Sequence, residues 1–144
     1  MFTTPALPRR FLQSLMADRA GSALVEAAFA VPLLALLLFG TLGYGSWFMT
    51  AHSLQQAAND AAHAAVAGLS GTERRTLVDQ SLLASRAAFP LPGADTINAT
   101  VGENGGFYTV TLRYNLSNAA IFAAIPLPLP GSALERSAVV RISS

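Results

Sequence analysis

The hydrophobic and polar residues of the chain change their pattern several times along its 144 residues. Residues 27–49 form an unbroken run of apolar, small and aromatic residues, and no charged residue occurs between Glu26 and Asp60. An α-helix needs about 20 such residues to cross the hydrocarbon layer of a membrane. The run is therefore long enough to span a bilayer with some tilt.

A second pattern follows directly, in which apolar residues recur every three or four positions, as they do on one face of a helix. They are Ala51, Leu54, Ala58, Ala61, Ala62, Ala65 and Leu69. Polar residues occupy the other face. We expect this amphipathic helix to continue directly from the apolar run. It should end near Gly68, because glycine commonly follows the last turn of a helix.

A second helix is predicted to begin at Ser70, with Glu73 completing a capping box. Its apolar face is moderate and consists of Leu77, Leu82, Leu83 and Phe89. Prolines at positions 90 and 92 cannot continue a helix, so the element should end before them.

Strict alternation of apolar and polar residues then indicates β-strands. Ile97, Ala99 and Val101 alternate with polar residues, and the sequence ENGG at 103–106 suits a tight hairpin turn. The next strand has an apolar face made of Tyr108, Val110, Leu112, Tyr114 and Leu116. Residues 134–142 form a last strand that can join the hairpin. The expected fold is α+β: a long N-terminal transmembrane helix extended into a small head, with a second helix and an antiparallel sheet of about three strands.

Composition and charge exclude several classes of function. The chain is 52% hydrophobic and 12% charged, its nine basic residues are scattered, and its net charge is +1, so nucleic-acid binding is not expected. It has no cysteine, which excludes thiol catalysis and disulfides. No catalytic triad or carboxylate pair is present, so we predict no enzyme and no cofactor. His52, Asp60 and His63 lack a further ligand, and no metal site is predicted.

The distribution of arginines predicts the orientation of the membrane helix. Arg9, Arg10 and Arg19 precede the apolar run, and the next arginine is Arg74. Positive charges stay on the cytoplasmic side, so the N-terminus should lie inside and the C-terminal part outside. A conventional cleaved signal peptide is the alternative. Its apolar core would be about 7–15 residues long, followed closely by a small-x-small cleavage site. Here the apolar run is longer, and no clear site of that type follows it directly.

The apolar run contains a proline and several glycines. Pro32 removes one backbone donor and should loosen or kink the helix. Gly40, Gly43 and Gly45 lie near its outer end. They are either the ordinary glycines of a membrane helix or a face for close helix packing.

Glu26 is an isolated carboxylate at the boundary of the apolar run, where an unpaired charge is costly. One explanation is that the dipole at a helix N-terminus favours a negative charge. A second follows from Gly21, five positions earlier. If a protease cut after Gly21, the new amino group of Ser22 would lie about 6 Å from Glu26 along the helix axis.

The stretch RAGSALVEAAFAVPLLALLLFG, residues 19–40, resembles the class III signal of type IV pilin-like proteins. It is more narrowly similar to the TadE-like pseudopilins of the tight-adherence (Tad/Flp) pilus system. A basic leader ends in Gly21, and Glu26 is the fifth residue after it. An apolar helix with an early proline, Pro32, completes the resemblance.

The resemblance implies that a prepilin peptidase cleaves between Gly21 and Ser22. Glu26 would then be an assembly contact with the N-terminal amine of a neighbouring subunit. The implied partners are other pilin or pseudopilin subunits, the inner-membrane assembly platform and membrane lipid. The implied role is that of a minor pseudopilin in the assembly of a pilus or secretion filament for adhesion and biofilm formation.

The expected organisation is a cytoplasmic leader at 1–21, a transmembrane helix at 22–49 and a periplasmic head at 50–144. The location is the bacterial inner membrane, with passage into an extracellular pilus left open. Two other hypotheses compete with this one. An uncleaved single-pass protein could bind an envelope partner through its head, or a conventional signal could precede a secreted domain or small enzyme.

Overall fold

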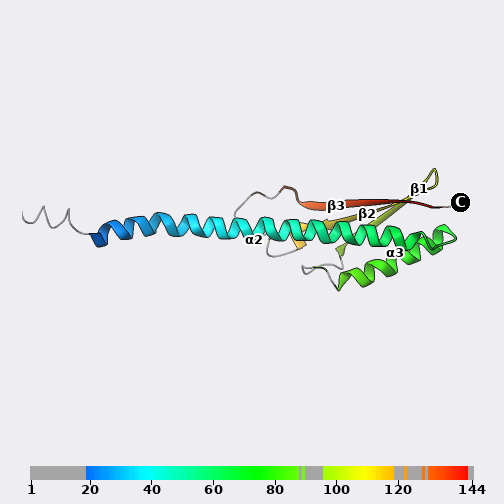
Figure 1. Cartoon of the computed structure of the whole chain (residues 1–144), viewed down its shortest axis with the longest axis horizontal. Helices are drawn as coiled ribbons and strands as arrows, with labels where there is room; N and C mark the ends of the chain where they lie inside the picture. Colours follow the sequence, from blue (N-terminus) through cyan, green and yellow to red (C-terminus); the bar gives the residue numbers. More distant parts are fainter. Residues whose placement is uncertain are drawn as a thin grey trace, which may run out of the picture. The chain divides into compact units, whose positions relative to one another are not determined.

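The computed structural model describes residues 19–87, 89, 96–118, 122, 128 and 130–142. Their elements follow in the order α2 (Arg19–Ala65), α3 (Gly71–Arg86), β1 (Asn98–Asn104), β2 (Phe107–Asn115), the 3₁₀ turn η2 (Leu116–Asn118) and β3 (Ala133–Arg141) (Figure 1). This α+β architecture is the expected one. Contacts divide the chain into two units, Met1–Leu38 and Phe39–Ser144.

Helix α2 is 47 residues long and joins the apolar run to the amphipathic pattern, as expected. Within the first unit, its side chains from Gly21 onward are exposed, except that Ala35 is half-buried. In the second unit a buried stripe begins on the helix. Gly40 is half-buried and Gly43 is buried, and the stripe continues through Trp47 and Thr50.

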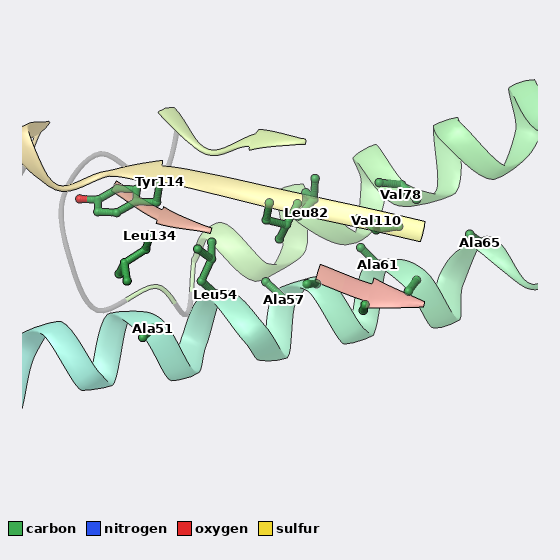
Figure 2. Packing of buried hydrophobic residues seen from close by; sticks show 14 of the residues in the cluster. Ala51, Leu54, Ala57, Ala61, Ala65, Val78, Leu82, Val110, Tyr114 and Leu134 are labelled. Atoms are coloured by element: carbon green, nitrogen blue, oxygen red, sulfur yellow. The ribbon is translucent and has the colours of Figure 1, made fainter. Parts of the chain in front are cut away.

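The core of the second unit lies between α2, α3 and one face of the sheet (Figure 2). Helix α2 contributes mostly small residues: Ala51, Leu54, Ala57, Ala58, Ala61, Ala62 and Ala65. Alanine allows a close approach of the helix backbone to the side chains of the sheet. Leu69, expected on this face, is instead 91% exposed, because α2 ends at Ala65 and Leu69 lies in the turn beyond it.

Helix α3 begins with the predicted cap. The Ser70 hydroxyl accepts from the Glu73 N–H at 3.2 Å, and the Glu73 carboxylate accepts from the Leu69 N–H at 2.9 Å. The buried row of α3 is Arg74, Val78 and Leu82, spaced by four residues. Leu83 was expected in the core and is 61% exposed, because one further residue turns it away from this row.

The sheet is antiparallel, with strand order β1-β2-β3. Asn104 pairs with Phe107 at the end of the hairpin, and Gly105 and Gly106 have φ of 58° and 79°. Two consecutive positive φ angles define the type I′ turn that the ENGG sequence favours. Strand β3 pairs with β2 from Phe107↔Arg141 to Asn115↔Ala133, as expected for the last strand. The buried face of β2 is the predicted one.

Gly68 has a different role from the expected helix-ending one. Among the described glycines only Gly105 and Gly106 have positive φ, so the turn after α2 does not need the left-handed conformation at Gly68. A Cβ on Gly68 would instead lie 2.7 Å from Arg74 Cγ and 2.8 Å from the Arg74 backbone nitrogen. Glycine is therefore required at position 68 because Arg74 leaves no room for a side chain.

Candidate functional site: the N-terminal segment of the long helix

The predicted cleavage residues lie near the start of α2. Gly21 and Ser22 are the third and fourth residues of the helix and both are exposed. Apart from its neighbours and the adjacent helix backbone, no atom lies within 4 Å of the position that a Cβ on Gly21 would occupy. The peptide bond between them is therefore accessible, but it has helical geometry in the intact chain.

Glu26 lies seven residues after the first residue of α2, and the first turn holds no acidic residue. The effect of a helix dipole is confined to the first and last turns. Stabilisation by the dipole therefore does not explain this carboxylate in the uncleaved chain. Glu26 is exposed, and within the described residues it has no hydrogen-bond or ion-pair partner.

Pro32 lies inside α2, which stays helical on both sides of it. The missing N–H leaves the carbonyl of Ala28, four residues earlier, without its usual intrahelical donor. The helix is thus not broken at Pro32, and a kink there remains a prediction.

The surface around these residues is strongly apolar. Leu24, Phe29, Leu33 and Leu37 are each more than half exposed. Among the described residues, one helix, Gly21–Ala65, contains a segment long and apolar enough to cross a membrane, and none of that segment is buried by the rest of the chain. This arrangement fits a single-pass membrane protein. In lipid, an apolar face that no protein covers carries no penalty, whereas the lone carboxylate of Glu26 does.

The class of protein follows from these features. A long N-terminal apolar helix that continues into a small head with a second helix and a three-stranded antiparallel sheet is the pilin-like α+β architecture. Residues 21–63 match the model of the family described as TadE-like protein. The match confirms the resemblance to this family over the segment that carries it. No curated protein and no solved structure gives a match.

The family match covers most of α2 and none of α3 or the sheet. It begins at Gly21, the residue that we predict to end the leader. All the predicted site residues, Gly21, Ser22, Glu26 and Pro32, fall within it. They lie along one helix.

The two histidines of α2 are both exposed. His63 Nδ1 is 2.7 Å from the Asn59 carbonyl, and His52 is exposed on the helix surface. Within the described ranges, no group of three or more His, Asp or Glu side chains is placed to hold a metal ion.

Two polar contacts of the second unit were not predicted. Arg74 is 8% exposed, donates from Nε to the Gly68 carbonyl at 3.1 Å, and pairs through Nη1 with both Glu103 carboxylate oxygens at 3.1 Å. Tyr44 Oη donates to the Pro128 carbonyl at 2.7 Å. Both contacts join residues far apart in sequence, and the type of residue does not indicate which partner it contacts.

Proposed function

We propose that this protein is a minor pseudopilin that is cleaved by a prepilin peptidase between Gly21 and Ser22 and acts in the assembly of a Tad/Flp-type pilus or secretion filament. One observation carries the proposal. The TadE-like match begins at Gly21, and Glu26 is the only charged residue of the sequence between Gly21 and Asp60. Its carboxylate is exposed and has no partner among the described residues.

Cleavage requires the start of α2 to unwind, because a protease binds its substrate as an extended chain. Gly21 lowers the cost of unwinding, since glycine is about 1 kcal/mol less favourable than alanine in a helix. Its lack of a side chain also lets a membrane-embedded active site approach the backbone closely. Both properties favour cleavage at this residue over its neighbours.

Cleavage would change the electrostatic environment of Glu26. Ser22 would become the first residue, and its positive amino group would lie about one helical turn, roughly 6 Å, from Glu26 along the axis. Opposite charges 4 Å apart attract by up to about 4 kcal/mol at an effective dielectric constant of 20. Pairing between the Glu26 of one subunit and the amine of the next would satisfy both charges and fix the register of neighbouring helices.

The remaining parts of the proposal follow from this role. The leader is 1–21, the transmembrane helix 22–49 and the head 50–144. The protein is held in the bacterial inner membrane, with the N-terminus cytoplasmic and the head periplasmic. Its partners are the prepilin peptidase, other pilin or pseudopilin subunits and the assembly platform.

The test compares three forms of the full chain in cells that assemble the pilus: wild type, Glu26→Gln and Glu26→Asp. Glutamine keeps the size of the side chain and removes its charge, whereas aspartate keeps the charge. We expect all three to be processed equally, because the substitutions leave Gly21 and Ser22, the residues of the proposed scissile bond, unchanged. Assembly, measured as the filament mass recovered by shearing, should be lost in Glu26→Gln and partly kept in Glu26→Asp. Normal piliation with Glu26→Gln would contradict the assembly role.

A further inference from the structure

The position of the head-side membrane boundary on α2 follows from the length of the helix. The hydrocarbon layer is about 30 Å thick, and an α-helix rises 1.5 Å per residue, so about 20 residues cross it. We count from Ala27, the first residue after Glu26. The membrane-spanning part of the helix then ends near Ser46, or slightly later if the helix tilts. Tyr44 and Trp47 therefore lie at this boundary.

Contacts of the head reach back to the same level of the helix. Gly43 is buried, and Trp47 is half-buried against the core of the second unit. Tyr44 donates its hydroxyl hydrogen to the carbonyl of Pro128, 84 residues away, at 2.7 Å. Side chains of a helix lean toward its N-terminus, which here is the direction of the bilayer centre. Along the helix axis, this bond therefore holds Pro128 at the depth of Tyr44 or closer to the bilayer centre.

We propose that Pro128 lies in the interfacial layer of the membrane, so that the head contacts the lipid surface directly and is not held above it by the helix. This inference rests on the proposed membrane anchoring and adds a second lipid contact to it. The ligand is the phospholipid interface. Tyr44 is the residue that keeps Pro128 there.

The chemistry around Pro128 suits a region poor in water. The sequence PLPLP at 126–130 contains three prolines, which have no N–H, so five residues carry only two backbone donors. A segment with fewer N–H donors has a lower cost of entering a low-dielectric layer. The Pro128 carbonyl is already satisfied by Tyr44.

The helix surface beside this contact is also typical of an interface. Phe48 is 64% exposed and packs edge-to-face against Trp47, with 5.1 Å between ring centroids. Leu42 and Met49 are exposed as well. Tyrosine and tryptophan are enriched at the level of the lipid headgroups, where one end of the ring is dry and the other wet.

The absence of cysteine from the chain makes a site-specific test direct. Single cysteines are introduced in the full-length protein as Leu34→Cys, Pro128→Cys and Leu69→Cys. Each is labelled with the fluorophore NBD and reconstituted in phosphatidylcholine vesicles that contain shallow or deep doxyl-labelled lipid. Leu34 marks the middle of the span, and Leu69, which is 91% exposed, marks the turn after α2.

We expect the label at Pro128 to be quenched by the shallow doxyl lipid at least about twofold more than the label at Leu69, and only weakly by the deep one. The label at Leu34 should be quenched mainly by the deep lipid. Trp47, the one tryptophan in the sequence, should show shallow quenching in the unmodified chain. Adding Tyr44→Phe should reduce quenching at Pro128, whereas Tyr108→Phe, which removes a hydroxyl in the head, should not.

The outcomes separate this inference from the proposed function. Quenching at Leu34 but none at Pro128 beyond that at Leu69 would overturn the interfacial contact and leave the membrane anchor intact. Deep quenching at Pro128 would also overturn it. An unquenched label at Leu34 would remove the membrane helix itself and with it both proposals.

Discussion

The two parts of helix α2 share one secondary structure, but the first exposes large apolar side chains and the second buries mostly small ones. Up to Phe39 the helix carries large leucine, valine and phenylalanine side chains, and the described ones are exposed. From Ala51 to Ala65 its inward face is almost all alanine, and it is buried. Large side chains suit contact with lipid, whereas alanine allows the sheet and α3 to pack close to the helix backbone. The comparison shows that side-chain size, and not helix propensity, distinguishes the two environments.

The same substitution made in each part should have the most unequal effect. Leu54 is fully buried and Leu33 is 69% exposed. Leu54→Ala should lower the free energy of unfolding of the head by about 2–5 kcal/mol, because it removes buried methyl groups and leaves a cavity. Leu33→Ala should change it by less than about 0.5 kcal/mol. Urea unfolding of the full chain in detergent, followed by Trp47 fluorescence, measures both, and equal losses would contradict the division of the helix.

A methyl group added at two glycines should test the close packing at the end of α2. Gly68→Ala places a Cβ against the backbone of Arg74 and should cost about 1–3 kcal/mol, because backbone atoms move less easily than side chains. Gly71→Ala, where nothing lies within 4 Å, should be neutral or stabilise α3 by up to about 1 kcal/mol. The thermal midpoint should therefore fall in Gly68→Ala and stay the same or rise in Gly71→Ala. A shift of equal size and sign would show that Gly68 is not required for space.

The head should lose stability at high pH through its buried tyrosines. Burial raises the pKa of Tyr108, an effect that Arg75 partly opposes, and burial also raises the pKa of Tyr114. A raised pKa in the folded state means that the unfolded chain releases its proton first. The contribution to stability is complete below about pH 10, the ordinary tyrosine value, and is lost as the pH rises through the folded pKa.

Tyr108→Phe should reduce this alkaline loss. The Tyr108 hydroxyl is buried and has no hydrogen-bond partner within the described residues, so its removal at neutral pH should be neutral or stabilise the head by about 1 kcal/mol. Unfolding curves at pH 7 and above pH 10 give both quantities. A large loss of stability at pH 7 would mean that the hydroxyl has a partner after all.

The smallest effect is expected at a surface pair of α3. Arg75 Nε lies 3.3 Å from Asp79 Oδ2, one turn away, and both side chains are substantially exposed. Asp79→Asn, which removes the charge of the pair and leaves the bond from Arg75 Nη2 to the Ala99 carbonyl, should cost a few tenths of a kcal/mol at low salt and less at high salt, because an exposed pair is screened. Its sensitivity to salt should exceed that of the Gly68 and Leu54 variants.

Local patterns in the sequence were sufficient for much of the fold. The Ser70 cap, the Gly105–Gly106 turn and the alternating face of β2 each depend on neighbouring residues, and the structure confirms all three. Errors concern the end of one helix and the position of the buried face on the other. Leu69 was assigned to a face that the helix no longer has, and Leu83 to a row that Val78 occupies. The partners of Arg74 and Tyr44 could not be predicted, because contacts across 29 and 84 residues leave no periodic signal.

The site residues were predicted from one short segment and not from the pattern of helices and strands. Gly21 and Glu26 were identified by their spacing in one segment, and the TadE-like match includes both. The structure adds that Glu26 lies beyond the first turn of the intact helix and has no described partner. The sequence alone allows the helix dipole as an explanation of Glu26, because it does not show where the helix begins.

The most direct test of the account is the intact mass and N-terminal sequence of the membrane-extracted protein, made with and without a co-expressed prepilin peptidase. We predict a chain that starts at Ser22 only when the peptidase is present, and a Gly21→Val control that keeps its leader. A chain that still starts at Met1 with an active peptidase would contradict cleavage and favour an uncleaved anchor. A start beyond the apolar run would contradict the role of Glu26 altogether.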